Sequence, residues 1–370
     1  MRDTAKGMLE NLLSLVKKYG FVPNGSRVYY LNRSQPPLLT LMVRIYIDAT
    51  NDLKWLRKNV QTLDRELTWW LANRTVTVVK DGVNYTLARY GCHSTTPRPE
   101  SYYEDLKTCR EERCHIDIKS AAESGWDFSS RWIFDHKGGI NATLSDIQTT
   151  RVIPVDLNAF LCKAFADLSY LYLKVGHTSK VTQWKEKADE WKNSILMVLY
   201  NLEDGIWYDY DLSLRQARKI FYPSNLTPLW AKAYVRRMLS DAEYGSRAVK
   251  YLKGQGVDKY KGGIPTSLTE TGEQWDLPNA WPPIQEIVIL GLRETGQKDA
   301  VQLAKEFSTR WIEANMKGFE ENDNKMFEKY DAIKPGQYGG GGEYPVQTGF
   351  GWSNGVALSL INVYYTGDNL

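Results

Sequence analysis

The chain has 370 residues, of which 42% are hydrophobic and 25% charged, so it can bury a substantial core and has the balance of an ordinary globular protein. Its formal net charge of +3 is spread along the sequence without a block of Lys or Arg, which argues against nucleic acid or an anionic membrane surface as a partner. No run of eighteen apolar residues occurs, so no membrane span is expected. The unusual figures are 13 Trp and 23 Tyr, which fill cores and also stack on sugar rings.

Helical periodicity dominates the sequence from its first residues. Residues 4–18 carry charged and apolar residues at helical spacing and lack the continuous apolar stretch of a signal peptide, so they predict an amphipathic helix inside a fold. Residues 75–90 predict a β-hairpin, with β-branched residues before a turn at Asp81 and Gly82. Further helices are predicted at residues 38–48, 52–72, 157–174, 179–200, 228–253, 284–295, 300–315 and 355–365.

The predicted helices fall into consecutive pairs, joined by loops that contain Pro and Gly, without a repeat regular enough for a solenoid. This pattern predicts an all-α fold, a toroid of helical hairpins that forms one domain over residues 1–370. In such a fold the longer loops gather at one end of the helices, where a rigid scaffold can position them for chemistry. The loops that combine carboxylates or Arg with Trp, Tyr, Pro and Gly are residues 23–37, 95–106, 123–132, 274–283, 327–331 and 337–354.

The last of these loops, QYGGGGEYPVQTGFGWSN, places four glycines directly before Glu343. Glycine lets the main chain approach a ligand closely. A phosphate-binding loop would carry Lys and then Ser or Thr after its glycines and would open a helix, so phosphate is not the expected ligand. A flexible surface linker is the alternative interpretation, and the neighbouring Tyr344, Phe350 and Trp352 argue against it.

Acidic residues in the aromatic loops suit the hydrolysis of a glycosidic bond, which needs one acid to protonate the leaving oxygen and one carboxylate to attack or to activate water. Asp127 lies between Trp126 and Phe128, where partial burial would raise its pKa and keep a proton available. The alternative for Asp127 is a helix cap before the Ser pair that follows. The alternative for Glu328 is a solvated charge beside Lys329. The acidic candidates are Asp127, Glu100, Asp276, Glu328 and Glu343.

Other polar side chains in these loops suit a polyhydroxylated ligand. Arg33 and Arg98 lie in Pro-rich loops, where a guanidinium can hold a carboxylate in position or donate several hydrogen bonds to sugar hydroxyls. Asn24, Ser34 and Gln35 add short polar groups that can orient such a ligand. Surface salt bridges are the alternative for the two arginines, and turn formation is the alternative for Asn24.

Asn-X-Ser/Thr sequons are dense for a chain of this length and indicate the secretory pathway, so a secreted glycoprotein is expected, with a membrane-attached form left open. The sequons lie at Asn24, Asn32, Asn73, Asn84, Asn141 and Asn225. The four cysteines, Cys92, Cys109, Cys114 and Cys162, are compatible with disulfides in that compartment. Cys109 with Cys114 could close a small loop, although the pairing stays open. No metal is expected at the CREERCH stretch, in which His115 is the one plausible histidine ligand.

The stretch QWDLPNAWPP, residues 274–283, resembles a signature of the α,α-trehalases, glycoside hydrolase family 37. The stretches PNGSRVYYLNRSQPP, PRPE, ESGWDFSSRW and GGGGEYPVQTGFGWSNGV resemble further landmarks of that family in the same order, from about residue 10 to the last helix. The resemblance implies an (α/α)6 toroid that hydrolyses trehalose to two glucose molecules with inversion of configuration. It also implies that no cofactor or metal takes part, and trehalose is the expected small-molecule partner.

The resemblance implies roles for individual residues as well. Asp127 in SGWD would be the general acid, and Glu328 in FEKYD would be the general base that activates water. The glycines would let the main chain close over a sugar while Glu343 accepts hydrogen bonds from its hydroxyls. The substrate contacts that the resemblance implies are Asn24, Arg33, Ser34, Gln35, Arg98, Pro99, Glu100, Gly125 and Glu343. A glycan at Asn24 or Asn32 would occupy this site, so both sequons are expected to be unused.

The family's first signature, a Pro-Gly-Gly-Arg-Phe stretch that leads into Tyr-Trp-Asp, is absent from this sequence. The chain is therefore expected to resemble an N-terminally truncated trehalase that lacks the first helices of the toroid. Two other functions stay open: a non-catalytic remnant that binds trehalose or another sugar, and an inverting glycosidase for another α-glucoside. A plain helical scaffold is disfavoured, because Trp, Arg and acidic residues cluster in the loops.

Overall fold

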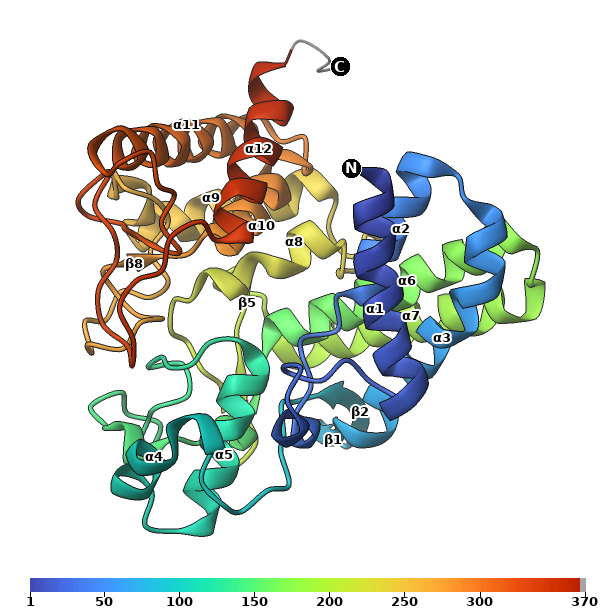
Figure 1. The fold of residues 1–370 in the computed structure, drawn as a ribbon, viewed down its shortest axis with the longest axis horizontal. Helices are drawn as coiled ribbons and strands as arrows, with labels where there is room; N and C mark the ends of the chain where they lie inside the picture. Colours follow the sequence, from blue (N-terminus) through green and yellow to red (C-terminus); the bar gives the residue numbers. More distant parts are fainter. Residues whose placement is uncertain (367–370) are drawn as a thin grey trace.

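The computed structural model describes residues 1–366, and helices form most of it (Figure 1). The α-helices are α1 (Arg2–Tyr19), α2 (Leu39–Thr50), α3 (Leu53–Asn73), α4 (Tyr102–Thr108), α5 (Glu112–Ser124), α6 (Val155–Val175), α7 (Thr178–Leu199), α8 (Thr227–Ala231), α9 (Asp241–Gly254), α10 (Pro282–Arg293), α11 (Lys298–Glu321) and α12 (Gly351–Tyr365). The 3-10 helices are η1 (Val28–Asn32), η2 (Pro99–Ser101), η3 (Leu144–Asp146), η4 (Thr149–Arg151), η5 (Pro223–Leu226) and η6 (Val257–Lys259). The predicted all-α class is confirmed.

The predicted helices are present with small shifts at their ends, except over residues 228–253. That segment is not one helix, because α8 ends at Ala231, is followed by Lys232 with a φ of 52°, and α9 begins only after Ser240. Ser240 and Glu243 form a capping box, a helix start signal that the prediction overlooked. Helices α4 and α5 were not predicted. Helix α5 is buried on nearly every side and places charged residues inside, so its sequence has no clear amphipathic stripe.

The predicted β-hairpin is confirmed. Strand β1 (Thr75–Lys80) pairs antiparallel with β2 (Val83–Ala88), and Asp81 and Gly82 form the turn with φ values of 52° and 74°. The expectation of one hairpin was incomplete, since further two-residue strands form small antiparallel pairings that are too short to show a sequence period. These strands are β3 (Val152–Ile153), β4 (Tyr200–Asn201), β5 (Ile206–Trp207), β6 (Tyr210–Asp211), β7 (Gln216–Ala217), β8 (Asn279–Ala280) and β9 (Tyr330–Asp331).

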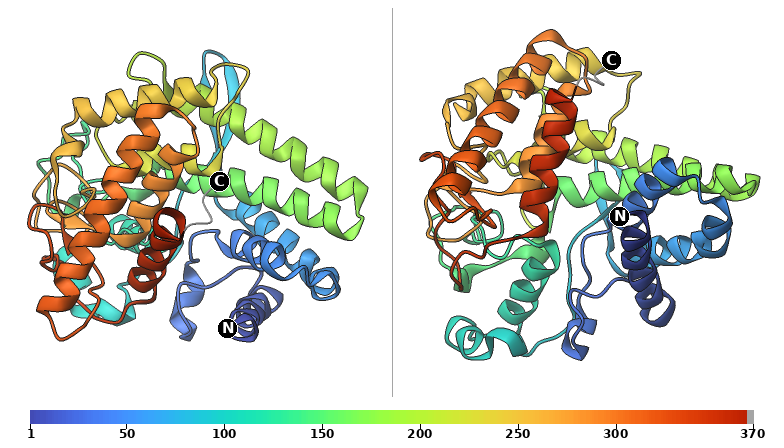
Figure 2. Two further views of the ribbon diagram at one scale, coloured as in Figure 1. Left: turned by 90° about the horizontal axis from the view of Figure 1, so that it is seen from above. Right: turned by 45° about the horizontal axis from the view of Figure 1, so that its top comes forward.

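The helices pack in a series rather than in flat layers. Helices α2, α6, α8, α10 and α12 contact one another in that order, while α7 packs along α6 and α11 packs along α10. Figure 2 shows the helices following one another around a curve, from the blue N-terminal helices through green to the orange and red C-terminal ones. Helices α1 and α3 pack against each other at the N-terminal end of this series.

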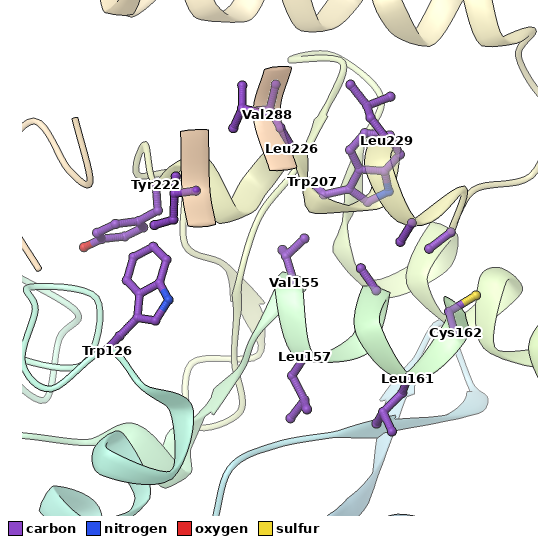
Figure 3. Packing of buried hydrophobic residues seen from close by; sticks show 14 of the residues in the cluster. Trp126, Val155, Leu157, Leu161, Cys162, Trp207, Tyr222, Leu226, Leu229 and Val288 are labelled. Carbon is purple, nitrogen blue, oxygen red and sulfur yellow. The ribbon is translucent and has the colours of Figure 1, made fainter. Parts of the chain in front are cut away.

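Helix α6 lies at the centre of the hydrophobic core (Figure 3). Val155 and Leu157 near its start and Leu161 one turn further are fully buried, and they extend toward different neighbouring elements. The buried side chains that surround α6 include Trp207, Leu226, Leu229 and Val288, which come from β5, η5, α8 and α10. Because α6 is packed from several sides, the loops that lead into and out of it start from a rigid element.

Cys109 and Cys114 form a disulfide between α4 and α5, and Cys92 and Cys162 are buried free thiols. The CREERCH stretch therefore holds a disulfide. Within residues 1–366 no group of three or more His, Cys, Asp or Glu side chains is arranged to hold a metal ion. A search of the same residues for a helix with the length and apolar character of a membrane span finds none.

Candidate active site

Asp127 lies in the loop after α5, which ends at Gly125 with a φ of 78°. No helix begins at Asp127, so the alternative interpretation as a helix cap is wrong. The following residues are anchored by the buried Asp276, whose carboxylate accepts hydrogen bonds from the Ser130 main-chain N–H at 2.6 Å and from the Ser130 hydroxyl at 2.7 Å. Asp276 was one of the acidic candidates, and its oxygens are occupied by this anchoring role.

The Asp127 carboxyl is partly buried, and burial raises its pKa to about 6. The positive charges of Arg98 and Arg33 act in the opposite direction, whereas the Glu343 carboxylate raises the pKa further. Asp127 therefore exchanges its proton close to neutral pH, as a general acid must. Arg33, Arg98 and Glu343, which the sequence placed in separate loops, thus lie close enough for their charges to act on Asp127.

Behind the Asp127 loop, Arg131 is completely buried between two carboxylates. Its Nη2 donates to Asp156 at 2.7 Å, and its Nε donates to Asp209 at 2.7 Å. These ion pairs fasten the loop to the start of α6 and to the strand region before β6. A buried guanidinium with two carboxylate partners fixes the main chain only four residues from Asp127.

The loop of residues 23–37 is attached to the site through Glu123, a fully buried residue of α5. The Glu123 carboxylate accepts hydrogen bonds from the Ser34 N–H at 2.9 Å, the Ser34 hydroxyl at 2.8 Å and the Arg74 guanidinium at 2.7 Å. The Gly91 N–H donates to its other oxygen at 2.8 Å. Ser34 is thus fully buried and bound to Glu123, so its side chain is part of the anchor.

Arg33 leads from this anchor toward the site. Its Nε donates to the Asn24 side-chain oxygen at 2.9 Å, its Nη2 pairs with Glu100, and Gln35 donates to the Asn24 carbonyl at 2.7 Å. Arg33 is only 2% exposed, and its Nη1 finds no acceptor among residues 1–366. This buried guanidinium keeps one donor that can bind a ligand oxygen. Because Arg33 is buried, the interpretation as a surface salt bridge is wrong.

Arg98 is also buried, and its guanidinium binds two carboxylates. Its guanidinium donates to Asp105 at 2.7 Å and to Glu343 at 3.0 Å, and the Ser101 hydroxyl donates to the second Glu343 oxygen at 3.2 Å. The surface-salt-bridge interpretation is therefore wrong for Arg98 as well. Pro99 begins η2 in an exposed position and offers no polar contact of its own.

Glu328 is 2% exposed, so it is not the solvated charge of the alternative interpretation. The Tyr344 hydroxyl donates to Glu328 Oε1 at 3.0 Å, and the Gln347 N–H donates to Oε2 at 3.4 Å. The pKa of Tyr344 is raised by burial, and the Glu328 and Asp127 carboxylates both add to the effect. The Tyr344 hydroxyl therefore lies within electrostatic reach of both acids, which are 201 positions apart in the sequence.

The glycine segment is a close-packed turn, so the alternative interpretation as a flexible linker is wrong. A Cβ at Gly339 would collide with the Asn279 side chain, and one at Gly341 would collide with the carbonyl of Gly272. Gly341 and Gly342 also have positive φ, 72° and 88°. The bare backbone lets Gly339, Gly341 and Gly342 pack against the loop of residues 272–279, and the turn still carries Glu343 to Arg98.

A cavity of about 430 Å³ opens beside the Asp127 loop, within the range of about 300–1,000 Å³ that is typical of small-molecule sites. Gln35 and Gly125 line it, together with aromatic residues from several elements. Trp126 and Trp275 stack at 5.1 Å between ring centroids, and Trp275 stacks on Trp281 at 4.0 Å. The lining of the cavity is mostly apolar, and the predicted residues Asp127, Glu328, Arg33, Arg98 and Glu343 are not part of it.

Several residues of the site escaped the sequence reasoning. Asp105, Glu123 and Arg131 hold the predicted residues in place, and Tyr344 contacts Glu328, yet none of them was assigned such a role. Buried ion pairs leave no periodic signal. Tyr344 was noted only as one aromatic residue beside the glycines, and its position directly after Glu343 was the available hint.

Comparison with known proteins identifies one family. The family model "Trehalase" matches residues 1–365. The chain is 55% identical to the trehalase of Tenebrio molitor over 374 residues, which covers 99% of this chain and 67% of that protein. It is 47% identical to the trehalase of Homo sapiens over 377 residues, which covers 100% of this chain and 63% of that protein. The chain thus spans about two thirds of the length of these relatives.

Among solved structures, the neutral trehalase Nth1 of Saccharomyces cerevisiae has a similar fold, with a TM-score of 0.70 and 19% sequence identity. The match covers 98% of this chain and 68% of that one. A GH63 mannosylglycerate hydrolase of Thermus thermophilus matches 89% of this chain and 75% of its own, with a TM-score of 0.58 and 19% identity. At these identities the likeness concerns the fold, and it supports the predicted toroid of helical hairpins.

Replacement of Glu123 by Gln is expected to destabilise the protein strongly, by about 3–5 kcal/mol, because it leaves the buried Arg74 charge without its partner. Urea unfolding of the variant and the parent measures this loss. Glu112→Gln on the exposed side of the same helix is the control and should change the free energy of unfolding by less than about 0.5 kcal/mol. Equal effects of both variants would contradict the anchoring role of Glu123.

Proposed function

The chain belongs to the trehalase family, and on this premise we propose that it hydrolyses α,α-trehalose to two glucose molecules. The observation that carries the proposal is the pair of acids near Tyr344, of which Glu328 is buried and Asp127 partly buried. Glu328 accepts the Tyr344 hydrogen bond, and the Asp127 charge acts on the same hydroxyl. Two carboxyl groups with different surroundings are what the two roles of a glycosidase need. The cavity of about 430 Å³ reaches Gly125 and Trp126, directly before Asp127 in the sequence, although neither acid lines it.

In the proposed mechanism Asp127 is the general acid. Its raised pKa keeps the carboxyl protonated in part of the molecules near neutral pH, and it donates this proton to the oxygen that bridges the two sugars. Glu328 is the general base and removes a proton from a water that attacks the anomeric carbon from the opposite face. This direct displacement inverts the configuration, so each event releases one α- and one β-glucose.

The cationic side chains of the site would hold the sugar hydroxyls. The free Nη1 of Arg33 supports such a contact, since it is a buried donor without a protein acceptor. Arg98 and Glu343 present a donor and an acceptor side by side. We assign the substrate contacts to Asn24, Arg33, Ser34, Gln35, Arg98, Pro99, Glu100, Gly125 and Glu343. Among these, Ser34 and Pro99 would act through the main chain or through shape, because the Ser34 hydroxyl is bound to Glu123 and Pro99 has no polar side chain.

Asp127→Asn is expected to abolish trehalose hydrolysis while trehalose binding, measured by calorimetry, stays close to that of the parent, because Asn keeps the shape but cannot donate the proton. Asp323→Asn, at an exposed position, is the control and should keep full activity. Proton NMR of freshly formed product should show both anomers of glucose. The mechanism would be rejected by release of α-glucose alone or by an active Asp127→Asn variant. It would also be rejected if the parent bound trehalose without releasing any glucose.

The pH dependence of kcat/KM should report the proton on Asp127. As the pH rises through about 6 the acid loses its proton, so kcat/KM should fall by about tenfold for each further pH unit. Glu343→Gln removes a charge that raises this pKa, so the alkaline limb should move to lower pH. Glu320→Gln, exposed on α11, is the control and should leave the limb in place. A limb that does not move in Glu343→Gln would argue against Asp127 as the titrating acid.

We also propose that the protein is secreted or membrane-attached and glycosylated. Asn73, Asn84 and Asn141 are exposed and are the expected glycan sites, whereas Asn225 is fully buried. Asn24 and Asn32 are partly buried at the site and are expected to be unmodified. Peptide mass spectrometry of protein from a eukaryotic secretory host measures the occupancy of each sequon. Glycans at Asn24 or Asn32 would contradict the assignment of the substrate site.

A further inference from the structure

Lys329 directly follows the proposed base and is completely buried. Its Nζ donates to the carbonyl oxygens of Gly340 at 2.9 Å and Gly341 at 3.1 Å, and to the side-chain oxygen of Gln274 at 3.3 Å. All three acceptors are neutral. Its Nζ forms no ion pair within 4.0 Å in the part of the chain that the structure describes, and it lies 5.2 Å from the centre of the Trp281 ring.

A buried ammonium without a carboxylate partner is unfavourable for stability, because the charge loses water and gains no counterion. Burial lowers the pKa of Lys329 to about 8, and the Glu328 carboxylate acts in the opposite direction. The other acids on the packed elements are Glu273, Asp276 and Glu343, and none forms an ion pair with Lys329. An apolar side chain of similar length would fill the same space, so packing alone does not account for the charge.

The contacts of Lys329 lead to both proposed catalytic acids. The side-chain oxygen of Gln274 accepts a hydrogen bond from the Lys329 ammonium. The side-chain NH₂ group of Gln274 in turn donates to the main-chain carbonyl of Asp127 at 2.6 Å. The Gly340 and Gly341 carbonyls begin the turn that continues into Glu343 and Tyr344, which bind Arg98 and Glu328. Lys329 is also the residue that directly follows Glu328 in the sequence.

We propose that Lys329 is a positioning residue, whose ammonium holds the glycine turn and, through Gln274, the main chain of Asp127. It thereby fixes the positions of Asp127, Glu328 and the glycine turn relative to one another. The inference rests on the proposed function, and it adds a completely buried residue that acts through its contacts with Gln274, Gly340 and Gly341. A geometric clamp of this kind acts on the chemical step, because a small displacement of a catalytic group lowers the rate steeply.

Lys329→Met tests the clamp, since Met keeps much of the stem and removes the donors. The expected result is a kcat for trehalose lower by about 10–100-fold, with a smaller change in KM, in a protein whose melting temperature is unchanged or higher. Lys334→Met, in the same segment but exposed, is the control and should keep the parental kcat. A folded Lys329→Met variant with parental kcat would overturn the inference, and so would a loss that only follows a lowered melting temperature.

A second variant covers the case in which Lys329→Met does not fold. Gln274→Met breaks the link between the ammonium and the Asp127 carbonyl and leaves the two glycine contacts in place. It should also lower kcat, and where both single variants fold, the double variant should lose less than the sum of their two effects, since they belong to one chain of contacts. Parental kcat in Gln274→Met, or strictly additive losses, would overturn the link. A parent protein that releases no glucose would instead reject the proposed function, and the clamp with it.

Discussion

The candidate site depends on charges that are buried and neutralised by partners from distant parts of the chain. Glu123 shows the constraint most clearly, because its fully buried carboxylate gathers Ser34, Arg74 and Gly91 around the end of α5. A carboxylate in this position is tolerated only while its donors are in place. The loop that carries Arg33 and the turn that leads to Asp127 are therefore held by the same residue.

The same principle is repeated around the Asp127 loop. Arg131 is neutralised by Asp156 and Asp209, and Arg98 by Asp105 and Glu343. Each of these pairs joins a loop to a different element, so the loops are fixed although they have little regular secondary structure of their own. Such preorganised charge is favourable for catalysis, because the protein does not need to reorient its dipoles during the reaction. Lys329 differs from these residues in that its partners are neutral, and this difference suggested a role beyond stability.

The sequence predicted the helices whose apolar residues recur at helical spacing. It failed where a helix is buried on several sides, because such a helix lacks this spacing. The predictions for α1, α3, α6 and α11 succeeded because each has a continuous apolar face or core. Helix α5 was missed, since Asp117, Lys119 and Glu123 are all inside the protein. The roles of Asp127 and Glu328 came from the resemblance of short motifs to a family. Their supports, Glu123, Arg131 and Gln274, could not be found in this way, because a buried hydrogen bond between distant residues leaves no trace in the spacing of either one.

The ion pair between Arg98 and Glu343 joins residues that are 245 positions apart. Contacts between residues so far apart in the sequence form slowly, and they form only after both segments have been made. During synthesis the Asp127 loop can fold long before Glu328 and the glycine turn leave the ribosome. A polypeptide that ends before Glu328 would carry Asp127 without the residue proposed as its counterpart. The acid and the base of the proposed mechanism therefore come together only once both segments of the chain have been made.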